Sequence, residues 1–132
     1  MDNKLTVLGI DFGLAKVGLA ISEGKLAEPY KVIRYKDNTI LGETLKRIIH
    51  DKGVDKIVVG LSEGKMGVIQ KTFAAELSRA TLLPVDTFDE TLTTLEAQRL
   101  AIQAGIKTKK RKEREDAFAA ALILQAYLDN IK

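Results

Sequence analysis

The sequence predicts a single α/β domain whose core is a five-stranded mixed sheet covered by helices. Its length of 132 residues suits one domain, and 45% of the residues are hydrophobic, enough for one packed core. The first two apolar runs are joined by a connection too short for a helix, which makes them antiparallel neighbours. Later apolar runs alternate with helical patterns, as in parallel strands joined by helical crossovers. We therefore expect residues 1–132 to form one domain in which an antiparallel unit precedes parallel strands.

The first part of the chain contains three strand patterns. Apolar runs at residues 5–10 (LTVLGI) and 17–22 (VGLAIS) predict two buried strands. Residues 12–16 leave room only for a turn between them. Residues 30–35 (YKVIRY) alternate apolar and basic side chains, which favours a half-exposed third strand. These three strands should form an antiparallel meander.

Helix and strand patterns alternate through the rest of the chain. The expected helices cover residues 39–52, 67–80, 93–104 and 113–130, and the expected strands cover residues 56–60 and 85–88. Gly53 and Gly105 end two of these helices, and Thr93 with Glu96 forms a capping box at the start of another. The last helix contains the run AFAAALILQAYL, which is apolar nearly all the way round. It should therefore be buried rather than lie on the surface.

The composition excludes several kinds of site. The chain has no cysteine, which rules out a disulfide, a zinc–thiolate centre and a thiol nucleophile. No stretch approaches the roughly 18 apolar residues of a membrane span. The N-terminal residues contain an acid followed by a strand pattern, where a signal peptide would have a basic region. These features favour a cytoplasmic protein with no membrane partner.

Basic charge is concentrated in one short segment. Residues 107–114 carry six basic groups and one acid, a sum of +5, which leaves −2 for the rest of a chain whose total is +3. A local cationic patch is what a polyanion-binding site needs. The alternative interpretation is a solvated loop.

Three acids stand at the ends of predicted elements. Asp11 ends the first strand, Glu90 follows the fifth strand, and Asp116 lies in the first turn of the last helix. The first, fourth and fifth strands should be parallel, so Asp11 and Glu90 should share one edge of the sheet. Converging carboxylates repel one another unless a metal neutralises them, and oxygen ligands favour Mg²⁺ or Mn²⁺. On position alone, the favoured interpretation is that Asp11 is a turn residue, Glu90 a surface acid and Asp116 a helix-terminal charge.

Five motifs occur in a specific order along nearly the whole chain. They are GIDFG at residues 9–13, VVGL at 58–61, DETLTT at 89–94, KKRK at 109–112 and DAFAAALILQ at 116–125. Together they resemble the YqgF (RuvX) family, ribonuclease H-like proteins described as Holliday junction resolvase-like. That family is also assigned maturation of the precursor of small-subunit ribosomal RNA. The glycine motif alone would be weak, whereas all five in order are specific.

The resemblance implies a ribonuclease H-like fold and a metal-dependent nuclease with Mg²⁺ or Mn²⁺, as two ions, for a cofactor. Two such ions about 4 Å apart can activate a water and stabilise the leaving oxygen in phosphodiester hydrolysis. It implies that the catalytic and metal-binding residues are Asp11, Glu90 and Asp116. We expect Lys109, Lys110, Arg111 and Lys112 to bind nucleic acid, because this basic run lies just ahead of Asp116. Lys16 either contacts a phosphate as well or is a solvated lysine at a strand end. Glu115 is an alternative third acid, although its side chain points about 100° away around the helix.

The sequence departs from the family pattern at three places. Ala15 precedes Lys16 where the family has Lys-Arg, and Thr91 replaces an Arg. After Leu61 the family continues P-L-N-x-D-G, whereas here the residues 62–64 (SEG) follow at once, about six residues shorter. A shorter loop should leave the site more open and less selective. Glu63 in this loop is either a spectator or a further acid near the metals.

Three functions are compared. The first is a metal-dependent endonuclease that processes the 5′ end of pre-16S ribosomal RNA or, alternatively, resolves branched DNA, acting as a monomer or weak homodimer. The second is a non-catalytic nucleic-acid-binding relative. The third is an ATP-binding module of the sugar-kinase or actin type, because residues 11–13 followed by Gly18 resemble their phosphate loop. That class needs a second domain, and no G-x-x-x-x-G-K-[ST] motif is present.

Overall fold

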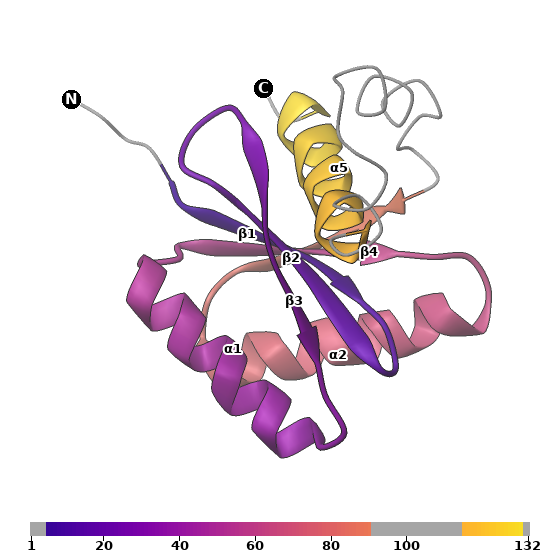
Figure 1. Cartoon of the computed structure of the whole chain (residues 1–132). Helices are drawn as coiled ribbons and strands as arrows, with labels where there is room; N and C mark the ends of the chain where they lie inside the picture. The colour runs from indigo at the N-terminus through magenta and orange to yellow at the C-terminus, as the bar shows by residue number, and fades with distance from the viewer. Residues whose placement is uncertain (1–4, 91–114, 131–132) are drawn as a thin grey trace.

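The computed structural model is a twisted sheet with helices on both faces (Figure 1). It describes residues 5–90 and 115–130. The elements follow in the order β1 (Val7–Phe12), β2 (Lys16–Ser22), β3 (Ala27–Arg34), α1 (Asn38–Lys52), β4 (Lys56–Leu61), α2 (Lys65–Thr81), β5 (Val85–Asp89) and α5 (Glu115–Asn130). The helix predicted at residues 93–104 lies outside the described residues. In the described ranges, no helix combines the length and the apolar character needed to cross a membrane.

The strands lie in the order β3-β2-β1-β4-β5 in one sheet. The first three strands pair antiparallel, and β1 with β4 and β4 with β5 pair parallel. This confirms the predicted mixed sheet. Because β1, β4 and β5 run in the same direction, their carboxyl ends meet at one edge, which carries Asp11, Leu61 and Asp89. That edge is where open α/β sheets place their sites.

Two strand boundaries differ from the prediction. β1 continues past residue 10, because Asp11 pairs with Gly18 and Phe12 pairs with Val17, so Asp11 belongs to the strand and not to the turn. β3 starts at Ala27, three residues earlier than predicted, and includes Pro29. Proline lacks an amide donor, but β3 is an edge strand and its register shifts at this point, so the missing hydrogen bond is tolerated.

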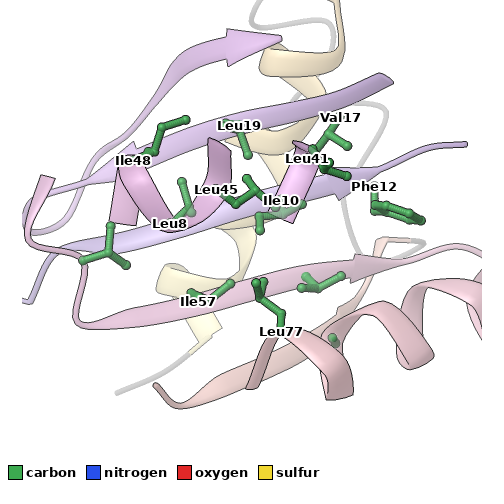
Figure 2. Close-up of a cluster of buried hydrophobic side chains, with 13 residues drawn as sticks. Leu8, Ile10, Phe12, Val17, Leu19, Leu41, Leu45, Ile48, Ile57 and Leu77 are labelled. Atoms are coloured by element: carbon green, nitrogen blue, oxygen red, sulfur yellow. The ribbon is translucent and has the colours of Figure 1, made fainter. Parts of the chain in front are cut away.

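Side-chain alternation along β1 sends neighbouring residues to opposite faces. Leu8, Ile10 and Phe12 join the core beneath α1 and α2, which Figure 2 shows with Leu45 and Leu77. Val7 joins the second core beneath α5. Asp11 has the same parity as Val7, so its carboxylate lies on the α5 face. The predicted burial of the last helix is confirmed by its six buried residues, Ala117, Ala120, Ala121, Ile123, Leu124 and Tyr127.

Glycines let α5 approach the sheet closely. A Cβ added at Gly18 would stand 1.9 Å from the backbone oxygen of Asp116, and one at Gly60 would stand 2.6 Å from Ile123 Cδ1. Neither position tolerates a side chain unless the helix moves outward. Gly18 therefore sets how near the first turn of α5, and with it Asp116, comes to β2.

We expect Gly18→Ala to destabilise the protein by about 1–3 kcal/mol, since overpacking a tight contact costs that much. The backbone oxygen of Asp116 is not a flexible side-chain end, so the strain must move α5. Chemical denaturation measures the loss. Gly42→Ala is the matched control, because an added Cβ there meets nothing within 4 Å. It should be neutral or stabilising by up to about 1 kcal/mol in helix α1. Equal effects of the two changes would contradict the close-packing explanation.

Candidate functional site

Asp11 is the central acid of the candidate site. It lies near the end of β1 on the face covered by α5, paired with Gly18 of β2. Burial raises the pKa of Asp11 from 3.8 to about 6, and the negative charges of Glu90 and Asp116 add to the increase. Glu90 and Asp116 therefore both lie near enough to affect the Asp11 carboxyl, although the three residues are far apart in the sequence.

Glu90 directly follows β5 and is half-buried. Its Oε1 accepts a hydrogen bond of 2.7 Å from the Ser62 hydroxyl. Ser62 comes directly after β4, and β4 pairs with β5 as far as Leu61 and Asp89. Ser62 and Glu90, the next residues along the chain, therefore extend the contact between the two strands through a side-chain hydrogen bond. This bond holds one oxygen of the Glu90 carboxylate.

Asp116 lies in the first turn of α5, where an acid is favoured by the helix dipole. Its Oδ2 forms an ion pair with Lys16 Nζ at 3.0 Å. Lys16 was predicted to contact nucleic acid, and the structure places its ammonium on a carboxylate of the site. Glu115 is exposed, whereas Asp116 is half-buried and acts on Asp11. The geometry thus favours Asp116 over Glu115 as the third acid.

The chemistry of these side chains suits a divalent cation. All three are carboxylates, hard oxygen donors of the kind that Mg²⁺ and Mn²⁺ prefer. The raised pKa of Asp11 reflects its burial first and then the negative charges of Glu90 and Asp116. A bound cation would offset all three effects. Among the described residues, no three such side chains stand close enough to form a ready-made metal site. The acids therefore fit a cation by charge and donor type and would have to close around it.

The sequence interpretation missed Gln70. Within this helix the apolar Ile69 is 39% exposed, whereas the polar Gln70 is only 1% exposed. The face of α2 that packs on the sheet consists of Gly67, Gln70, Ala74 and Leu77. A glutamine within that helical spacing is the signal that could have identified it, because a buried amide must find hydrogen-bond partners.

Other predicted residues lie away from the three acids or outside the described ranges. Glu63 is exposed and lines a cleft of about 230 Å³ beside Ser62 and Asp89. Thr91 and the basic residues Lys109, Lys110, Arg111 and Lys112 lie outside the described residues.

Comparisons with known proteins agree on the family. The RuvX model, described as Holliday junction resolvase, matches residues 5–130. A protein of Thermoanaerobacter pseudethanolicus is 39% identical over 97% of this chain and 99% of its own length. One of Agathobacter rectalis is 40% identical over 95% of each chain. Both are named "Putative pre-16S rRNA nuclease".

Solved structures agree on the fold. RuvC of Thermus thermophilus, in complex with a Holliday junction substrate, matches with a TM-score of 0.67 and 15% identity over 95% of each chain. The fowlpox virus Holliday junction resolvase matches with a TM-score of 0.57 and 11% identity over 96% of this chain and all of its own. The strand order and these matches confirm the ribonuclease H-like fold, and the sequence matches show that this chain belongs to the RuvX family.

Proposed function

We propose that this protein is a metal-dependent endonuclease of the cytoplasm that hydrolyses phosphodiester bonds in structured RNA, with the 5′ end of pre-16S ribosomal RNA as its substrate. The observation that carries the proposal is the convergence of Asp11, Glu90 and Asp116 at the carboxyl edge of the sheet. Relatives that align over nearly their full length carry the corresponding name. The family match also favours a nuclease over the ATP-binding module considered from the sequence.

In this proposal Asp11, Glu90 and Asp116 hold Mg²⁺ or Mn²⁺, because each offers carboxylate oxygens of the kind that these ions prefer. When bound, the metal activates a water and stabilises the leaving oxygen of the cleaved bond. Asp11 acts as the central ligand, since the charges of both other acids act on it. Lys16 forms an ion pair with Asp116. If Asp116 bound a metal, the Lys16 ammonium would be available to pair with a phosphate oxygen of the substrate.

Parallel digestion tests the proposal. Precursor 16S ribosomal RNA and a four-way DNA junction are incubated with the protein and Mg²⁺ or Mn²⁺. Cleavage of the RNA near its 5′ end supports the proposal, and preferential cleavage of the junction would replace it with a resolvase. Binding of both substrates without cleavage of either would identify a non-catalytic relative.

We expect Lys16→Met to tighten Mn²⁺ binding and to raise KM for the RNA. The substitution removes the cation that competes for Asp116 Oδ2 and also removes a charge available to phosphate. Calorimetric titration with Mn²⁺ and steady-state kinetics measure the two effects. Lys46→Met on exposed α1 is the control and should change neither. Weaker Mn²⁺ binding by the Lys16 variant would contradict competition between the ammonium and the metal.

A further inference from the structure

A buried side-chain relay links the three parallel strands at the site. Gln70 Nε2 donates to the Phe12 carbonyl at 3.1 Å, and Gln70 Oε1 accepts from the Ser62 backbone N–H at 2.6 Å. Gln70 Nε2 also lies 3.3 Å from Ser62 Oγ, which donates to Glu90. We call Gln70 and Ser62 the relay. It joins the residue after Asp11 to the carboxylate of Glu90.

The relay acts where backbone pairing stops. The parallel pairing of β1 with β4 ends at Ile10 and Val59, two residues short of the strand ends at Phe12 and Leu61. Beyond that point the two strands no longer share backbone hydrogen bonds. The Gln70 amide spans this gap, because it donates to the Phe12 carbonyl and accepts from the Ser62 N–H. It thus connects the ends of β1 and β4, as backbone hydrogen bonds do in the earlier part of the two strands.

Backbone packing holds Ser62 against α2. A Cβ added at Gly67 would stand 2.2 Å from the Ser62 carbonyl oxygen, so the absence of a side chain at Gly67 lets this residue lie directly on the helix. The connection from β4 to α2 is only residues 62–64, which leaves Ser62 little freedom to move. The backbone N–H of Ser62 bonds to Gln70, and its hydroxyl bonds to both Gln70 and Glu90.

We propose that Gln70 and Ser62 are positioning residues that set the separation of Asp11 and Glu90. The inference rests on the proposed function, since it concerns the acids of that site. A Glu side chain has several rotatable bonds, and a hydrogen bond to one oxygen removes much of that freedom before a ligand binds. Groups that orient metal-binding carboxylates change metal affinity or activity by about 10–100-fold when removed.

The decisive variants change the Ser62 hydroxyl alone. Ser62→Ala keeps the backbone N–H that donates to Gln70 Oε1. It removes the hydroxyl that donates to Glu90 and that accepts the longer hydrogen bond from Gln70 Nε2. We expect kcat to fall about 10-fold, KM to stay within about twofold, and the Kd for Mn²⁺ to rise about 10-fold, the lower end of such effects. Ser62→Thr restores a hydroxyl and should recover most of both losses. Ser78→Ala, on helix α2, is the control and should change neither kcat nor the Kd for Mn²⁺.

Gln70→Met tests the other half of the relay. It keeps the length of the side chain but leaves the Phe12 carbonyl and the Ser62 N–H without this partner, so the Tm should fall as well. Combined with Ser62→Ala, it should add little further loss of Mn²⁺ affinity, because both changes break one unit. Fully multiplicative losses would overturn the relay as a unit.

Unchanged kcat and Mn²⁺ affinity in Ser62→Ala would overturn the proposal, as would a Thr variant as defective as the Ala variant. A wild-type protein that binds Mn²⁺ but cuts neither substrate would overturn the proposed function alone. The role of the relay would then still be tested by comparing the Kd for Mn²⁺ of the wild type and the Ser62 variants. A wild-type protein that fails to bind Mn²⁺ would overturn both.

Discussion

Asp11→Asn should abolish nuclease activity, lowering kcat by about 10³-fold or more, as loss of a central catalytic group does. The amide keeps the shape of the side chain but removes the negative charge between Glu90 and Asp116. Metal affinity should fall with it, because a neutral amide oxygen is a weaker ligand for a hard cation. Cleavage assays with Mg²⁺ and titration with Mn²⁺ measure the two losses. Full cleavage by the variant would remove Asp11 from the site.

The same change should stabilise the metal-free fold above pH 6. Burial, Glu90 and Asp116 raise the pKa of Asp11 from 3.8 to about 6, so the folded protein holds this proton more tightly than the unfolded chain does. The contribution of Asp11 to stability is therefore greatest below about pH 4 and is lost as the pH rises through about 6. The Asn variant has no carboxyl group to ionise, so it does not lose this folding free energy, which is of the order of 1–3 kcal/mol.

Denaturation at pH 4 and at pH 8, each with EDTA, checks this sign. The Asn variant should gain on the wild type only at pH 8. Adding Mg²⁺ at pH 8 should stabilise the wild type and leave the variant unchanged, because only the carboxylate gains a cation. A variant that is less stable than the wild type at pH 8 without metal would show that Asp11 is not under the repulsion described.

Local patterns predicted the sheet because each strand and helix carries its own periodicity. The short β1–β2 connection and the helical crossovers then left one arrangement, and the last helix was identified by its apolar run. The predicted start of β3 at residue 30 is too late, because the strand continues through Pro29 to Ala27. A proline is tolerated in a strand mainly where that strand lies at the edge of the sheet, as β3 does. Edge position is a property of the whole fold and not of the segment.

The sequence predicts the three candidate acids but not the contacts that their side chains make. Asp11, Glu90 and Asp116 stand at element ends within recognisable motifs, so topology brings them together. The hydrogen bond from Gln70 to Phe12 spans 58 positions in the sequence, and the ion pair of Lys16 with Asp116 joins β2 to α5. Such pairs depend on how deeply one helix packs against the sheet, which no local spacing encodes.

The basic run should supply most of the sequence-independent affinity for nucleic acid. Lys109, Lys110, Arg111 and Lys112 lie outside the described residues, but the chain itself limits their distance from the site. Lys112 precedes Asp116 by four residues, which span at most about 14 Å when fully extended. A phosphate bound by this run therefore stays near the acids.

Changing all four residues to Ala should weaken binding similarly for most sequences and flatten its salt dependence. Each phosphate contact contributes a log–log slope of about 0.9 on duplex DNA, so loss of four contacts would reduce the slope by about 3.6. Binding measured from 50 to 200 mM salt gives the slope directly. A variant with four exposed lysines elsewhere changed to Ala, Lys25, Lys36, Lys46 and Lys71, removes the same charge and controls for net charge alone. If both variants keep the wild-type slope, the run is a solvated segment and the substrate is held by other groups; if only the control keeps it, the run delivers the phosphate to Asp116.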